Sequence, residues 1–213
     1  MPATAYSGSG RSPFYSDLSI GLAILLLFAL FRGHSDWVLL ISWVLIFGYL
    51  ILLRRFAALM HLLLATILAA IWVHFAKDYY AYKIAYIQIF ELNSLPLMAW
   101  TLSLFELGEY CSYLKFKPKS LNFLFFVLVV WTTGIFLETF AYHVLEIRDT
   151  MTASYPGLPF CDCIHAPTWM KVAYALMAPS YYLVKILADS GITLILKKND
   201  GGNVVPVNDV VKN

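Results

Sequence analysis

Charged side chains are scarce in this sequence. Asp, Glu, Lys and Arg make up 13% of its 213 residues, whereas hydrophobic residues make up 61%. A soluble domain of this size is about one quarter charged and about half apolar. So few charges cannot cover a surface that faces water, and the composition therefore predicts an integral membrane protein.

Cysteines and basic clusters are scarce as well. Three cysteines do not make the disulfide framework of a small secreted protein. The net charge is +2 and the basic residues are scattered, so we expect no nucleic-acid partner. The first 17 residues lack the basic patch, apolar core and cleavage site of a signal peptide. We expect the first hydrophobic segment to stay in the mature protein.

Long hydrophobic segments fill most of the chain. A helix needs about 20 apolar residues to cross a bilayer core of about 30 Å. Such segments are expected at 14–31, 37–53, 56–75, 84–105, 121–144 and from 169 to at least 187. The predicted fold is an all-α bundle of about six transmembrane helices, with the first two as a tight hairpin. It forms one polytopic domain, 1–213, with flexible tails at 1–13 and 199–213.

The distribution of Lys and Arg predicts the orientation of this bundle. Cytoplasmic loops of membrane proteins carry the excess of these residues. Nine lie on the side that includes the loop 114–120, and five lie on the other side. Both termini are therefore expected in the cytoplasm, and the loop 145–168 is expected outside.

Glu138 is the strongest candidate for a functional residue. It shares one helix face with Gly134 and Tyr142, because the three recur four residues apart. A carboxylate at membrane depth costs about 2.5–3.5 kcal/mol, and such residues usually face a cavity or a partner. The sequence therefore predicts a catalytic acid at Glu138. The alternative is an interfacial carboxylate that only holds two helices together.

A second carboxylate, Glu91, is expected near the same depth. Glu91, Ser94, Met98 and Thr101 form a stripe at helical spacing, which predicts an inward-facing side of the fourth segment. Glu138 and Glu91 are expected to face each other or the outer histidines, and to share a proton. The predicted catalytic set is Glu138, Glu91, His143 and His74, and the predicted substrate-binding set is Tyr142, Trp131 and Trp169.

The long outer loop contains a cysteine-rich motif. Cys161, Asp162, Cys163 and His165 lie within five residues, and their side chains are ligands that copper(I) and zinc accept. A metal at Cys161, Cys163 and His165 is one hypothesis. The two cysteines could instead form a disulfide, or they could only pack in a loop that folds back over the bundle. The sequence indicates no particular cofactor.

Charged residues on the inner side receive simpler interpretations. Lys185 and Asp189 are four residues apart on one helix, which favours a neutralised pair at the inner interface. Glu106 and Glu109 are expected to face cytosolic water.

Three functions fit these patterns. The first is an enzyme that acts on a lipid or isoprenoid by carboxylate acid/base chemistry at an outer-leaflet site, where aromatic side chains stabilise apolar or cationic intermediates. The second is a structural or assembly subunit, whose partners are membrane proteins and lipids. The third is a small transporter, although no inverted repeat is visible.

Overall fold

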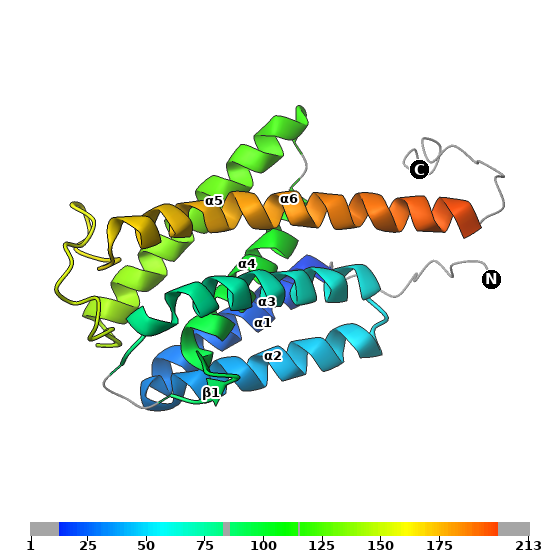
Figure 1. The fold of residues 1–213 in the computed structure, drawn as a ribbon. Coiled ribbons are helices and arrows are strands. Elements are labelled where there is room, and N and C mark those ends of the chain that lie inside the picture. The colour runs from blue at the N-terminus through cyan, green and yellow to red at the C-terminus, as the bar shows by residue number, and fades with distance from the viewer. Residues whose placement is uncertain (1–12, 83–85, 115, 200–213) are drawn as a thin grey trace.

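The computed structural model describes residues 13–82, 86–114 and 116–199, and within these ranges the chain forms six α-helices (Figure 1). The helices are α1 (Pro13–Leu30), α2 (Ser35–Leu52), α3 (Phe56–Ala76), α4 (Ser94–Tyr113), α5 (Lys119–His143) and α6 (Thr168–Asn199). Two single 3₁₀ turns, η1 (Arg32–His34) and η2 (Lys77–Tyr79), follow α1 and α3. The prediction of a helical fold is confirmed. The tails predicted to be flexible lie almost entirely outside the described residues.

A short β-hairpin precedes α4. Strand β1 (Gln88–Ile89) pairs antiparallel with β2 (Leu92–Asn93). Asn93 then caps α4, because its side chain accepts a hydrogen bond from the backbone N–H of Leu95 at 3.0 Å. Pro96 fits in the first turn, where a missing N–H costs no helical hydrogen bond. The fourth hydrophobic segment therefore becomes helical at Ser94, about ten residues later than the sequence predicted.

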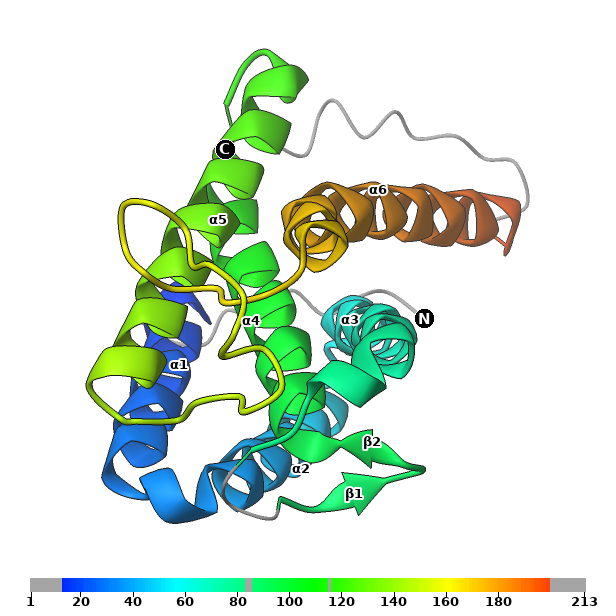
Figure 2. The ribbon, with the colours of Figure 1, turned by 60° about the vertical axis from the view of Figure 1, so that its left-hand side comes forward.

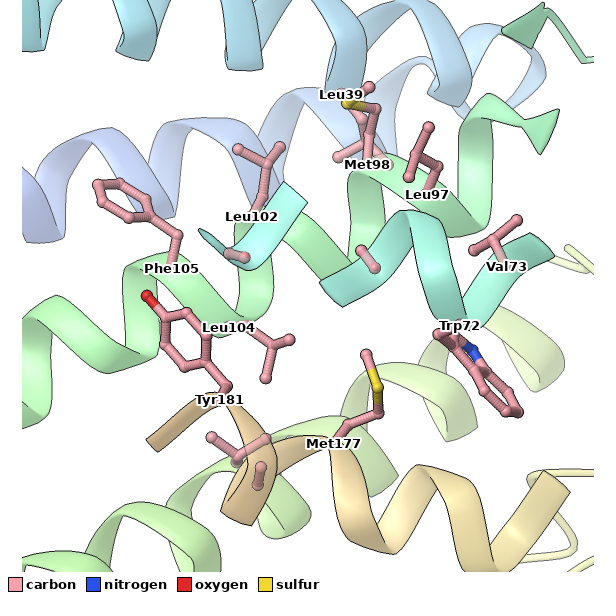
Figure 3. Close-up of a cluster of buried hydrophobic side chains, with 14 of the residues drawn as sticks. Leu39, Trp72, Val73, Leu97, Met98, Leu102, Leu104, Phe105, Met177 and Tyr181 are labelled. Carbon is pink, nitrogen blue, oxygen red and sulfur yellow. The ribbon is translucent and has the colours of Figure 1, made fainter. Parts of the chain in front are cut away.

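The core forms where α3 and α4 pack together. Small side chains recur along the inner face of α3 at Ala58, Ala65, Ala69 and Ala76, and all four are buried. Small residues allow two helices to approach closely. Figure 3 shows large side chains of α4 and α6, including Phe105 and Tyr181, filling the space beside this contact.

The outward faces of the helices are apolar and exposed. Leu22 and Leu26 on α1, Leu45 on α2 and Phe136 on α5 are examples of large exposed side chains. Soluble monomers rarely expose contiguous apolar surface on this scale. Within the described ranges, three helices are long and apolar enough to cross a membrane, namely 32–52, 56–79 and 119–143, and 14–30 forms a shorter apolar helix. These faces suit contact with lipid.

Candidate functional sites at the two ends of the bundle

Polar side chains gather at opposite ends of the bundle. One end, here called the Arg55 end, holds the link between α2 and α3, the last turns of α4 and the part of α6 around Lys185 and Asp189. The other, here called the long-loop end, holds the hairpin and the loop 144–167 that joins α5 to α6 (Figure 2). The two ends differ in how their charges are partnered.

Glu138 lies on α5 near the long-loop end. Its side chain is exposed, but its charge acts on the phenols of Tyr80, Tyr82 and Tyr174, which come from the link after α3 and from α6. Tyr80 and Tyr82 follow the apolar helix 56–79 in the chain. Burial raises the pKa of both phenols, and the nearby Glu138 charge contributes to the increase. Glu138 is thus an exposed carboxylate with three phenols within range of its charge.

Hydrogen bonds fix the aromatic side of this site. The indole N–H of Trp72 on α3 donates to the Tyr80 hydroxyl at 3.0 Å, and the hydroxyls of Tyr80 and Tyr174 lie 3.0 Å apart. The Tyr174 ring also contacts Trp100 of α4, with 5.1 Å between ring centroids. Four separate segments therefore hold these phenols in place beside α5.

The start of the long loop is attached to the same link. Asp149 accepts hydrogen bonds from the backbone N–H of Ala81 at 3.2 Å and of Met151 at 3.0 Å. Thr150 donates twice to the Ala81 carbonyl, from its N–H at 2.6 Å and from its hydroxyl at 2.7 Å. Partial burial raises the pKa of the Asp149 carboxyl, although these backbone donors oppose the increase. The charge of Asp149 also acts on the Glu138 carboxyl group.

Glu91 does not lie on a helix, so its predicted placement is wrong. It occupies the turn of the β-hairpin with a positive φ of 65°, and its side chain is 86% exposed. Its partner is Lys77, with 3.6 Å between the Nζ and Oε2 atoms. The rest of the predicted stripe, Ser94, Met98 and Thr101, is buried on α4. The acidic neighbour of Glu138 is Asp149, and the predicted pairing of Glu138 with Glu91 is not formed.

The outer histidines also lie apart from Glu138's phenolic neighbours. His74 is exposed on α3, where its ring contacts Phe75. His143 donates from Nε2 to the backbone carbonyls of Cys161 at 3.2 Å and Asp162 at 3.1 Å. In these positions His143 holds the long loop against the end of α5.

Tyr142, a predicted substrate-binding residue, is part of a stack that supports the long loop. Its ring stacks on His165 with 4.6 Å between centroids, and the Arg148 guanidinium lies 4.7 Å from the centroid of the same ring. The two predicted tryptophans lie on neighbouring helices. Trp131 donates to the Ala175 carbonyl at 3.0 Å, and Trp169 packs against the Trp72 ring at 5.8 Å.

The two loop cysteines form a disulfide with each other. Cys161 and Cys163 are bonded, which is one of the alternatives that the sequence left open. In this state neither sulfur is a thiolate, so the proposed ligand set of Cys161, Cys163 and His165 is not available to a metal. His165 instead contacts the Tyr155 carbonyl at 2.8 Å. Within the part of the chain that the structure describes, no group of three or more His, Cys, Asp or Glu side chains is placed to hold a metal ion.

At the Arg55 end, charged groups are paired across helices. The Arg55 guanidinium forms two hydrogen bonds to the Asp17 carboxylate of α1, at 2.7 and 2.9 Å. Its Nη2 atom lies 3.8 Å from Oε2 of Glu109 on α4. The hydroxyl of Tyr113 donates to Asp17 Oδ2 at 2.9 Å, and that of Tyr110 donates to the Asp17 backbone carbonyl at 2.9 Å. One arginine thus connects α1 and α4 to the α2–α3 link.

The same cluster continues from Glu109 to α3 and α6. Oε1 of Glu109 lies 2.8 Å from Nδ1 of His61 and 2.9 Å from Nζ of Lys185. The second ring nitrogen of His61, Nε2, lies 2.8 Å from Oδ1 of Asp189. Lys185 also donates to the Gly108 carbonyl at 3.0 Å and to the Ser112 hydroxyl at 2.8 Å. We call Asp17, Arg55, His61, Glu109, Lys185 and Asp189 the Arg55 cluster.

Two expectations about these residues are wrong. Lys185 contacts Glu109 on α4, and Asp189 contacts His61 on α3, so the predicted pair within α6 is replaced by pairs between helices. Glu109 does not face cytosolic water, since its side chain is only 13% exposed. Glu106 is half-buried and lines a small pocket together with Asp17, Arg55, Glu109 and apolar side chains of α1, α2 and α4.

No protein-family model matches the chain, and comparison with curated proteins and with solved structures finds no match.

Proposed function

We propose that the chain is a six-helix integral membrane protein with both termini in the cytoplasm, and that it acts on a lipid or isoprenoid at an outer-leaflet site around Glu138. The direction of the helices supports this topology. Asp17 of α1, Arg55 after α2, Glu109 of α4 and Asp189 of α6 all meet at one end, so successive helices run in opposite directions. The excess of Lys and Arg assigns that end to the cytoplasm.

The charged residues of α4 and α6 are compatible with a protein of six membrane-spanning helices. Both helices are long enough, at 20 and 32 residues, but each carries charges that lower its apolar character. Three of those charges are paired between helices, with Glu109 against Lys185 and His61, and Asp189 against His61. Ionisable residues inside a membrane typically face the bundle interior in this way.

The placement of Glu138 is the observation that carries the enzymatic proposal. Its side chain is exposed, and its charge acts on nearby phenols, two of which are fixed by hydrogen bonds. Under the proposal, Glu138 gives a proton to an unsaturated or oxygen-bearing group of the substrate and later takes one back. The aromatic rings of Tyr80, Tyr82 and Tyr174 stabilise positive charge that develops on the substrate.

Lipid analysis of cells that carry variants tests the proposal. Cells of the native host that lack this protein would be supplied with the wild-type chain, with Glu138→Gln or with Glu91→Gln. Glutamine keeps the size and hydrogen bonding of glutamate but cannot act as an acid. We expect Glu138→Gln to lack lipid species that the wild type and Glu91→Gln both make, with equal amounts of protein in the membrane. Identical lipid profiles for all three chains would contradict the proposal.

A structural subunit is the second candidate, and it is favoured by the surface of α5. Only 17% of an apolar 18-residue stretch of α5 is buried, against 39% of the corresponding stretch of α3. A partner protein in the membrane could cover the exposed residues Leu124, Leu128 and Phe136. Cross-linking in membranes from positions on this face tests the alternative. A single cross-linked protein partner, together with a silent Glu138→Gln variant, would favour the subunit over the enzyme.

A further inference from the structure

The buried ring of His61 lies between two carboxylates from different helices. Nδ1 lies 2.8 Å from Glu109 Oε1 of α4, and Nε2 lies 2.8 Å from Asp189 Oδ1 of α6. The His61 side chain is 7% exposed, whereas that of Asp189 is 51% exposed. The three groups therefore form a line from water at the Arg55 end to the interior of the bundle.

The line of Asp189, His61 and Glu109 needs one proton more than a neutral imidazole provides. A neutral imidazole carries one N–H, and an ionised carboxylate can only accept hydrogen bonds. Two contacts of 2.8 Å to carboxylate oxygens require two donors. The three groups must therefore share one proton more than a neutral ring and two ionised carboxylates possess.

Neighbouring charges make the two ends of the line unequal. Glu109 faces two cations, with Lys185 at 2.9 Å and Arg55 at 3.8 Å. Asp17 from α1 is bound to Arg55 and lies beyond it. Glu106 of α4 lines the adjacent pocket, and the hydroxyl of Tyr181 on α6 donates to the His61 backbone carbonyl at 3.3 Å, not to the ring. Water reaches Asp189, while Glu109 lies in the most charged part of the cluster.

We propose that Asp189, His61 and Glu109 form a proton-binding site that takes up a proton from the aqueous phase at the Arg55 end and holds it on the His61 ring. The proton first binds a carboxylate oxygen of Asp189. Asp189 then gives it to Nε2 of His61, whose Nδ1 already carries a proton. At the end both carboxylates are ionised, and the His61 cation donates from Nδ1 to Glu109 and from Nε2 to Asp189.

Glu109 stays ionised when His61 holds the proton, because Lys185 and Arg55 lie 2.9 and 3.8 Å from its carboxylate. Lys185 also donates to the Gly108 carbonyl and the Ser112 hydroxyl of the same helix. Arg55 is also bound to Asp17. The site can therefore take up and release a proton on His61 while these contacts remain, and it does so independently of Glu138 at the opposite end.

Solid-state nuclear magnetic resonance of the full chain with ¹⁵N-labelled histidine, in lipid nanodiscs at pH 7, tests the proposal. The His61 signals are identified by their loss in His61→Gln. We expect both ring nitrogens of His61 to be protonated in the wild type. In Asp189→Asn, the ratio of doubly to singly protonated rings should fall about tenfold or more, because one opposite charge in direct contact is removed. His143 is the internal control and should not change, since its contacts are to backbone carbonyls at the other end.

Each outcome decides the proposal. A singly protonated His61 in the wild type would overturn it, and this spectrum needs no variant. An unchanged ratio in Asp189→Asn would also overturn it, because Asp189 would then take no part in holding the proton. If Asp189→Asn does not fold, Asp189→Glu replaces it: this variant keeps the charge and should keep the doubly protonated ring. Loss of that ring in a folded Asp189→Glu chain would count against the proposal.

Discussion

The two ends of the bundle place carboxylates in opposite surroundings. At the Arg55 end, Glu109 contacts a histidine and a lysine within 2.9 Å and lies near an arginine. At the long-loop end, Glu138 is exposed beside phenols, with Asp149 as its charged neighbour. A paired carboxylate holds helices together, whereas an open one is available to a ligand. Carboxylates in a single chain can therefore serve different purposes, and their partners distinguish them.

Breaking the Arg55 pairing should have the largest effect on stability. Arg55→Met leaves the buried Asp17 carboxylate without its cation, and removal of one member of a buried pair costs about 3–5 kcal/mol. We expect a loss of about 3 kcal/mol because Arg55 itself is partly exposed. Arg54→Met is the matched control, since Arg54 is exposed, and it should change stability by about 0.5 kcal/mol or less. Thermal unfolding of both variants in detergent would show whether only Arg55 matters.

Close packing at Gly108 should give the next largest effect. A Cβ atom at this position would lie 2.8 Å from the ring of Tyr181, which is fully buried and cannot move aside easily. Gly108→Ala should cost about 1–3 kcal/mol through overpacking. Gly48→Ala on α2 meets no atom within 4 Å and should be neutral or slightly stabilising. Equal stabilities of the two variants would mean that α4 and α6 do not approach as closely as the structure indicates.

Neutralising Asp149 should have a smaller effect of the opposite sign. Its pKa is raised in the folded chain, mainly because burial disfavours the charge, so its ionisation opposes folding. Stability from this group is therefore present below its ordinary pKa of 3.8 and is lost as pH rises through the raised value. Asp149→Asn keeps an oxygen for the Ala81 and Met151 N–H groups. Unfolding at pH 4 and pH 7 should show a gain in stability for the variant that is greater at pH 7.

Among these residues, Glu91 should contribute least to the free energy of unfolding. It is 86% exposed and pairs with a surface lysine at 3.6 Å, and such pairs contribute about 0–1 kcal/mol. Glu91→Gln should unfold within about 0.5 kcal/mol of the wild type. A larger loss would mean that the hairpin turn is packed against something that the isolated chain does not contain.

Sequence reasoning predicted the helical fold because hydrophobic segment length and composition are local properties. It also singled out Glu138 and left open the Cys161–Cys163 bond. It misplaced Glu91, because the capping of α4 by Asn93 decides where the helix starts and the hydrophobic pattern before it looks helical too. It missed the Arg55 cluster, because its members are spread from residue 17 to residue 189 and meet only through packing of α1, α3, α4 and α6. Asp17, Arg55 and His61 gave a faint signal as ionisable residues at the ends of hydrophobic segments.

The thermal stabilities of Glu138→Gln and Glu109→Gln, measured side by side in the same detergent, test the difference between the two ends most directly. Glu109→Gln removes the negative charge that faces His61, Lys185 and Arg55. It should lower the melting temperature by about 6 °C or more, which corresponds to about 3 kcal/mol in a chain of this size. Glu138→Gln should melt within about 2 °C of the wild type, because no side chain depends on its charge for pairing in the described structure. A Glu138→Gln chain that melts as low as Glu109→Gln, or lower, would contradict the account, since Glu138 would then be a structural carboxylate.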